Sequence, residues 1–176
     1  MKMSPGKCQF SSAVASLAIT IGLSACAPPA ENEVQRGKRI ELLAGEIQSL
    51  RPNLSPPSTR RFAAVSVETA ARKRLDWNIH ATPWVNNFFV NAKINEYGLC
   101  YQWADYLYYR LNRELPAKLR MKLICRNRGK LNEHNAVCLY SQGGDWHKGL
   151  VLDGWKEAGI LLFYPVSADA GEWMPR

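Results

Sequence analysis

The pattern of apolar and polar positions divides the chain into a helical first part and a strand-rich second part. Apolar residues recur at helical spacing over residues 33–50, which predicts a helix that either forms a stalk or packs on the domain. A second helix is expected over residues 58–77, with Ser58 and Thr59 as capping candidates. The clearest helix starts at Cys100, because one face collects the apolar positions Cys100, Trp103, Ala104, Leu107 and Leu111.

After Pro116 the spacing changes to short apolar runs. These runs predict strands at residues 119–126, 135–141, 149–153 and 159–166. Residues 78–96 contain Pro83 and several asparagines, and we expect a short helix and a loop there. Helices that precede an antiparallel sheet make an α+β fold.

The first 25 residues are typical of an export signal. Lys2 and Lys7 precede an uncharged apolar run over residues 13–23, which is too short to span a membrane comfortably. The run ends in Leu-Ser-Ala-Cys26, which resembles the lipobox of bacterial lipoproteins, where cleavage before the cysteine leaves its thiol to carry a diacylglycerol. We therefore expect residues 1–25 to be a lipoprotein signal peptide and Cys26 to be lipidated, with an ordinary secretory signal as the alternative.

Prolines at positions 52, 56 and 57 interrupt the chain after the first helix, so we place a domain boundary near Ser58. Residues 26–57 would then form a lipidated tether with a possible helix, and residues 58–176 would form one domain. A chain of 176 residues is too short for two ordinary domains besides these segments.

Composition and charge exclude some partners. The 47% hydrophobic and 22% charged residues are typical of a globular protein. Removing residues 1–25 takes away two of the 23 basic residues and none of the 15 acidic ones, which leaves a net charge of +6. No nucleic-acid motif accompanies the basic clusters, so we expect no nucleic acid partner, and an exported basic chain more plausibly meets anionic headgroups or envelope polymers.

Three cysteines remain in the folded part once Cys8 leaves with the signal and Cys26 is lipidated: Cys100, Cys125 and Cys138. An odd count suggests one free thiol with a purpose, and Cys100 is the candidate. Cys125 and Cys138 would lie opposite each other in a hairpin that turns at residues 130–132, so a disulfide and two buried thiols both remain open. A zinc site that adds His134 would lack a fourth ligand and a tight Cys-x-x-Cys pair, and we expect no metal.

Cys100 stands where a helix begins, and both a helix amino terminus and a nearby imidazole lower the pKa of a thiol. Gly98 would let the backbone turn sharply into that helix. The alternative is that Cys100 is a buried small hydrophobe, as free cysteines often are.

His134 and Asp153 are the matching candidates for a base and its orienting acid. If residues 135–141 and 149–153 form a hairpin that turns on Gly143-Gly144, His134 faces Asp153 directly across the ladder. The carboxylate could then fix the tautomer of the imidazole, which in turn activates Cys100. The alternative is that His134 and Asp153 are ordinary turn and strand-end residues.

Three segments together resemble the transglutaminase-like branch of the papain-like cysteine hydrolase superfamily, and also a group of bacterial lipoproteins: residues 97–104, residues 133–135 and residues 150–155. The resemblance covers roughly residues 58–166. It implies a helix-start cysteine packed on an antiparallel sheet, with Cys100 as nucleophile, His134 as base and Asp153 as orienting acid.

The resemblance does not supply an oxyanion donor, because the glutamine that papain-like enzymes carry shortly before the cysteine is absent here. The backbone N–H of Cys100 could be one donor, and Asn95 or Asn91 could be another, unless both are loop residues.

From these patterns we expect a lipid-anchored thiol hydrolase or acyltransferase of the cell envelope, facing the periplasm or the exterior. It would act on an amide or isopeptide bond of a peptide or protein through a thioester, as a monomer and without a cofactor. The alternative is a non-catalytic peptide-binding or assembly lipoprotein that keeps the same fold.

Overall fold

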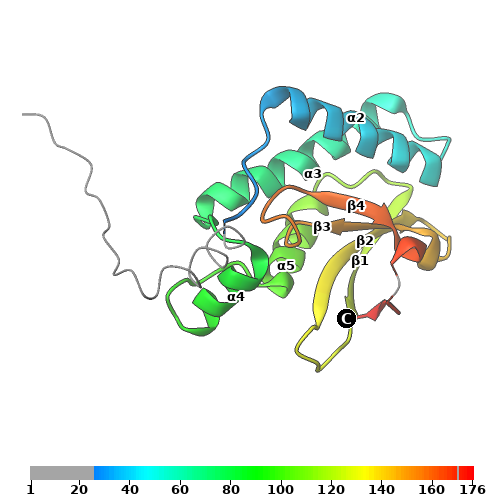
Figure 1. The fold of residues 1–176 in the computed structure, drawn as a ribbon. Coiled ribbons are helices and arrows are strands. Elements are labelled where there is room, and N and C mark those ends of the chain that lie inside the picture. The colour runs from blue at the N-terminus through cyan, green and yellow to red at the C-terminus, as the bar shows by residue number, and fades with distance from the viewer. Residues whose placement is uncertain (1–25, 170) are drawn as a thin grey trace, which may run out of the picture.

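A computed structural model describes residues 26–169 and 171–176, so the predicted signal peptide at residues 1–25 lies outside the described residues. The described residues form an α+β fold, as predicted, with four α-helices and a five-stranded antiparallel sheet (Figure 1). The helices are α2 (Glu33–Leu50), α3 (Pro56–Asp76), α4 (Pro83–Asn91) and α5 (Cys100–Leu111). Among the described residues, no helix combines the length and the apolar character needed to cross a membrane.

The sheet has the order β4-β3-β2-β1-β5, and each neighbouring pair is antiparallel. Its strands are β1 (Leu119–Arg126), β2 (His134–Ser141), β3 (Leu150–Asp153), β4 (Leu162–Pro165) and β5 (Met174–Pro175). The four predicted strands are confirmed to within a few residues. The two-residue strand β5 is too short to show an alternating pattern, and the sequence did not predict it.

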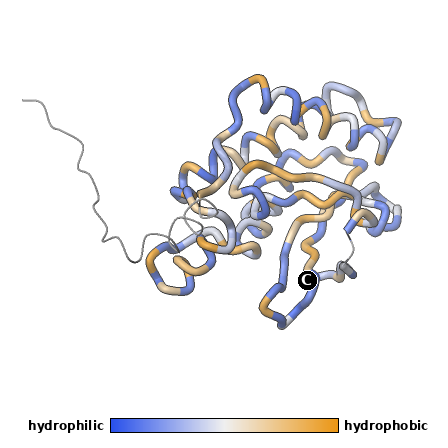
Figure 2. Tube along the Cα trace, in the orientation of Figure 1, coloured by the Kyte–Doolittle hydropathy of each residue, from blue (hydrophilic) through white to orange (hydrophobic). Residues whose placement is uncertain are grey.

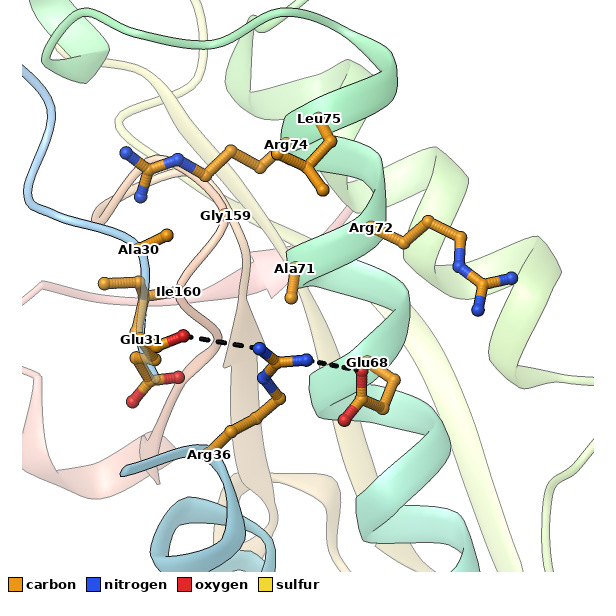
Figure 3. Close-up of a pocket in the computed structure, with 10 residues that line it drawn as sticks. All are labelled: Ala30, Glu31, Arg36, Glu68, Ala71, Arg72, Arg74, Leu75, Gly159 and Ile160. Atoms are coloured by element: carbon orange, nitrogen blue, oxygen red, sulfur yellow. Dashed lines mark hydrogen bonds and ion pairs between the residues drawn. The ribbon is translucent and has the colours of Figure 1, made fainter. Parts of the chain in front are cut away.

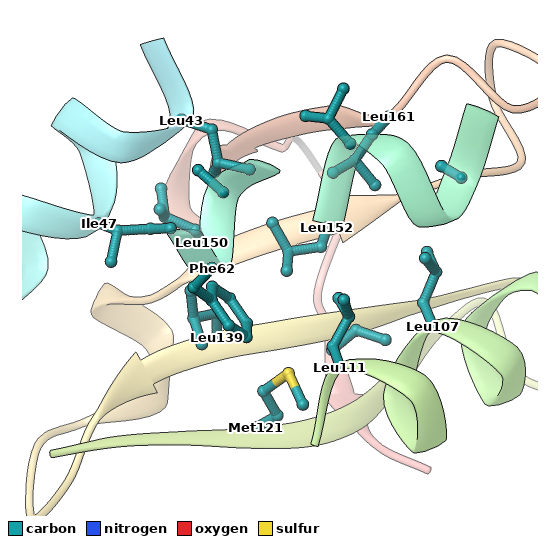
Figure 4. Close-up of a cluster of buried hydrophobic side chains, with 14 of the residues drawn as sticks. Leu43, Ile47, Phe62, Leu107, Leu111, Met121, Leu139, Leu150, Leu152 and Leu161 are labelled. Atoms are coloured by element: carbon teal, nitrogen blue, oxygen red, sulfur yellow. The ribbon is translucent and has the colours of Figure 1, made fainter. Parts of the chain in front are cut away.

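The main core lies between the helices and one face of the sheet. Figure 4 shows side chains from α2, α3 and α5 that meet leucines of the central strands, and Figure 2 shows how apolar these strands are along their length. A smaller cluster covers the opposite face of the sheet and consists of Ile124, Ala136, Cys138, Val151, Val166 and Trp173. Because successive residues of a strand point to opposite faces, β2 and β3 contribute to both clusters and are almost entirely buried.

Helix α2 has the predicted bounds and packs against α3, with Leu43, Ala44 and Ile47 buried in the main core. The predicted boundary near Ser58 therefore does not separate a tether from the domain, because the core already begins in α2.

The start of α3 also differs from the prediction. Ser55, not Ser58 or Thr59, caps the helix by accepting a hydrogen bond from the backbone N–H of Ser58. Pro56 and Pro57 lie in the first turn of α3 instead of breaking the chain. Proline is favoured there because the first helical N–H groups have no partner within the helix.

Candidate active site

His134 and Asp153 meet at one end of the sheet. His134 is the first residue of β2 and Asp153 is the last residue of β3, and antiparallel pairing brings these two ends together. The Nε2 atom of His134 lies 2.7 Å from Oδ2 of Asp153, and the two side chains are only 4% and 1% exposed. The sequence-predicted pair is therefore present as a buried hydrogen bond.

The register that brings the pair together differs from the predicted one. Cys138 pairs with Val151 and Leu139 pairs with Leu150, so Asp153 is level with Ala136 and not with His134. The prediction of direct opposition was wrong by two residues, because a 3₁₀ turn at Trp146–Lys148 follows the turn at Gly143 and lengthens the connection. A shift of two residues keeps each side chain on its own face of the sheet, so His134 still reaches Asp153 diagonally.

Both oxygens of the Asp153 carboxylate take part in hydrogen bonds. Oδ1 accepts hydrogen bonds from the backbone N–H groups of Trp155 at 2.9 Å and Lys156 at 3.2 Å, while Oδ2 faces His134. The indole rings of Trp155 and Trp173 lie against the imidazole, with centroids 5.0 and 5.7 Å away. This packing fixes the orientation of the imidazole and shields the pair from water.

Cys100 is the first residue of α5, and its half-buried thiol lies beside this pair. The sulfur is 3.8 Å from the backbone carbonyl oxygen of Glu133 and 3.7 Å from Nδ2 of Asn135. Burial alone would raise the pKa of the thiol. Hydrogen bonding with His134 and Asn135 and the charge of His134 outweigh burial, so the pKa of Cys100 lies below its ordinary value.

The pKa of the His134 imidazole shifts in the opposite direction, upward. Burial alone would lower the pKa of His134, but hydrogen bonds to Asp153 and Cys100 and the negative charges of both raise it to about 9. The Nδ1 atom is buried and has no partner with full hydrogen-bond geometry among the described residues. With a proton on Nε2 shared with Asp153, Nδ1 is the nitrogen left to take the proton of the thiol.

The entry to α5 holds Cys100 in place. Gly98 has a φ of +121°, and a Cβ atom there would overlap with Nδ2 of Asn86. The side-chain oxygen of Gln102 accepts from the backbone N–H groups of Gly98 at 2.9 Å and Leu99 at 3.0 Å. The role of Gln102 was not predicted, although a glutamine at the third helical position is a capping-box signal.

Asn135 is the second site residue whose role was not predicted. Its buried amide donates to Oε1 of Glu133 at 3.1 Å and reaches the thiol of Cys100, while its Oδ1 is buried and has no partner among the described residues. Its position next to His134 was the available signal. Of the oxyanion candidates named above, Asn95 donates its amide to Asn86 and Asn91 is exposed at the end of α4, and neither hydrogen-bonds Cys100.

No family model, no curated protein and no solved structure matches this chain. The chemistry of the site is therefore argued from its own atoms. A thiol with a lowered pKa, a buried imidazole and a fixed carboxylate have the arrangement that a nucleophile, a base and an orienting group require.

The other two thiols are buried and free. Cys125 pairs with Asn135 and Cys138 pairs with Lys122, so the predicted opposition of the two cysteines was wrong and no disulfide joins them. Burial raises the pKa of Cys138 to about 12, against the opposing charge of Lys122. Within residues 26–169 and 171–176, no three His, Cys, Asp or Glu side chains are grouped to hold a metal ion.

A separate cavity of about 230 Å³ lies between the segment before α2, the second half of α3 and the loop at Gly159-Ile160 (Figure 3). Arg36 crosses it and bonds both the carboxylate of Glu68 and the backbone oxygen of Glu31. None of Cys100, His134 and Asp153 lines this cavity, so it is not part of the thiol site.

Proposed function

We propose that the protein is a thiol hydrolase or acyltransferase that cleaves an amide or isopeptide bond through a thioester on Cys100. One observation carries the proposal: the buried His134–Asp153 hydrogen bond uses Nε2 and leaves Nδ1 of His134 to interact with the Cys100 thiol, whose pKa is lowered. The helix-start cysteine and the chain order of cysteine, histidine and aspartate also support a transglutaminase-like core.

The reaction needs the thiol of Cys100, the imidazole of His134 and an incoming water or amine. His134 takes the thiol proton, and the thiolate attacks the carbonyl carbon of the amide to form a tetrahedral oxyanion. The oxyanion collapses to a thioester as the C–N bond breaks, and the imidazolium returns its proton to the leaving amine. Water completes hydrolysis, and a second amine completes acyl transfer, each giving a proton to His134 as the thiolate leaves.

Two donors are placed to stabilise the oxyanion. The backbone N–H of Cys100 lies at the amino terminus of α5, where it needs no helical partner. The amide of Asn135 approaches the sulfur at 3.7 Å and is a side-chain donor of the site. We assign this second role to Asn135 in place of Asn91 and Asn95.

The proposed location is the cell envelope, with the chain held to a membrane by a diacylglycerol on Cys26. The substrate class is a peptide or protein amide that is accessible at that membrane. Cys26 is exposed in the structure and is available for such a modification.

Alkylation of the thiols tests the proposed function. The folded protein is treated with iodoacetamide below pH 7, and each cysteine is followed by peptide mass spectrometry. We expect Cys100 to react quickly and His134→Ala to slow it by at least about tenfold, because the thiolate loses its imidazolium partner. Cys138, whose pKa is raised to about 12, is the unreactive control within the same molecule.

Slow alkylation of Cys100 in both proteins would contradict the proposal and favour the non-catalytic peptide-binding alternative. Circular dichroism of His134→Ala checks that the variant remains folded, and the reaction of Cys138 reports any local opening of the sheet.

A further inference from the structure

Helix α4 shows an inverted pattern of burial. Its buried residue is the polar Asn86, whereas Trp84 and Phe88 are 62% and 65% exposed. These two side chains are four positions apart and therefore share one face of the helix. Just beyond the helix, Ile94 is also exposed. A helix that buries its amide and exposes a tryptophan and a phenylalanine has an apolar face that the other described residues do not cover.

The predicted lipid attachment site is fixed beside this helix. Cys26 forms an antiparallel bridge with Ala81, and the backbone N–H of Ala27 donates to the carbonyl of His80 at 2.8 Å. Ala81 is two residues before Pro83, where α4 begins. Figure 1 shows the blue start of the described chain approaching α4. The anchor point is thus held against the domain at one end of the exposed face.

We propose that Trp84 and Phe88 insert into the interfacial region of the bilayer that carries the diacylglycerol of Cys26. The inference rests on the lipidation in the proposed function and deepens it by naming the surface that faces the membrane. A lipid chain at Cys26 brings the bilayer to α4, and aromatic side chains partition well at the level of the headgroups.

The charges around α4 are compatible with anionic lipid. Residues 77–95 contain no aspartate or glutamate, and Lys93 is the single lysine or arginine among them, although the exposed Asp76 and Glu96 flank this segment. A negatively charged leaflet therefore meets no acidic residue on α4 itself, and Lys93 attracts it.

Docking on α4 would bring the membrane surface close to the thiol site. Trp84 packs against Trp155 with ring centroids 5.5 Å apart, and Trp155 in turn packs on His134. Asn87 of α4 accepts a hydrogen bond from the indole of Trp155 at 3.1 Å. The substrate class that fits this placement is an amide presented at the headgroup level of the same bilayer.

Quenching of tryptophan by brominated lipid tests the proposal. The full chain is purified from membranes, its diacylglycerol is verified by mass spectrometry, and it is reconstituted into vesicles of phosphatidylethanolamine and phosphatidylglycerol with or without bromine on the acyl chains. We expect brominated vesicles to quench the fluorescence and Trp84→Phe to remove most of that quenching. Phe88→Ser should also weaken it, whereas Leu42→Ser, a control at 66% exposure on α2, should not.

Equal fluorescence in the two kinds of vesicle, or quenching that survives Trp84→Phe, would overturn the docking surface. A chain whose Cys26 carries no diacylglycerol would overturn it as well, because the anchor would be missing. Alkylation of Cys100 in the same samples separates the two proposals, since loss of thiol reactivity leaves the quenching result unchanged.

Discussion

At the scale of single residues, the site depends on two ionisable groups that shift each other in opposite directions. Hydrogen bonding to Cys100 and Asp153 raises the pKa of His134 to about 9, and hydrogen bonding to His134 and Asn135 lowers the pKa of Cys100. Both shifts favour the state in which the proton of the thiol lies on the imidazole. A thiolate beside an imidazolium is the pairing that a nucleophile next to its proton donor requires.

The rate of alkylation of Cys100 should therefore rise in two steps with pH. The first step lies below the ordinary thiol range, because His134 stabilises the thiolate. The second lies near pH 9, where His134 loses its proton and the thiolate, without its counter-ion, becomes the stronger nucleophile. Iodoacetamide kinetics between about pH 5 and pH 10 measure both steps. A single step in the wild type, identical to that of His134→Ala, would show that the two side chains do not interact.

Asn135 should tune the same thiol. Replacing it by alanine removes the amide that approaches the sulfur at 3.7 Å, and a hydrogen bond to a charged group contributes about 1.5–3 kcal/mol. We expect the pKa of Cys100 to rise and its alkylation below pH 7 to slow roughly tenfold. Asn91→Ala, in the exposed part of α4, is the matched control and should leave the rate unchanged. Equal rates in the wild type, Asn135→Ala and Asn91→Ala would contradict this role. The amino terminus of α5 would then be, beside His134, the main group that stabilises the Cys100 thiolate.

At the scale of elements, the turn into α5 sets the position of Cys100. Gly98→Ala should lower the free energy of unfolding for two reasons. The backbone has a left-handed φ of +121°, and the new Cβ would lie 2.9 Å from Ile79 and still closer to Asn86. We expect a loss of about 2–4 kcal/mol in the free energy of unfolding, measured by urea titration. Gly129→Ala separates the two costs, because its φ of +75° is also left-handed but its Cβ would meet open space.

Gly129→Ala should cost only about 1 kcal/mol, the ordinary cost of a left-handed alanine. If both glycine variants lost the same stability, the contact with Asn86 would not constrain the turn. In that case Cys100 alkylation in Gly98→Ala should also match the wild type, which gives a second and independent check on the role of this turn.

The elements also show how far the sequence predicts this fold. Periodicity alone located α5 and β1, since an uninterrupted apolar stripe or a long apolar run leaves few alternatives. The start of α3 was misplaced because Pro56 and Pro57 resemble a chain break until a cap at Ser55 is seen to precede them. The register of β2 and β3 was wrong because the turn at Trp146–Lys148 uses residues that a tight glycine turn would have left in the ladder.

The candidate site was predicted better than the register, for a physical reason. An error of two residues along a strand preserves the face on which a side chain lies, so His134 and Asp153 remained partners. An error of three residues changes the face, and the predicted opposition of Cys125 and Cys138 was lost. Asn135 was missed because its role comes from a tertiary contact with Cys100, whereas Gln102 acts through a local capping contact that the sequence pattern could have indicated.

At the scale of the whole molecule, α2 decides where the folded domain begins. An isolated stalk and a packed helix share the same helical periodicity, so the sequence left both open, and only the burial of Leu43 and Ile47 distinguishes them. With α2 in the core, the chain from Cys26 onward is attached to the domain at both Ala27 and α2. A lipid on Cys26 would consequently hold the domain close to the membrane.

Replacing Ile47 by alanine tests this arrangement. Ile47 is fully buried between α2 and the rest of the core, and truncating such a side chain removes contacts and leaves a cavity that costs about 2–5 kcal/mol. Leu42→Ala removes a similar side chain from the exposed face of the same helix and should change the free energy of unfolding by less than about 0.5 kcal/mol. Urea unfolding followed by circular dichroism measures both variants. If α2 were only a tether, the two substitutions would have the same small effect, and the domain would unfold independently of the helix.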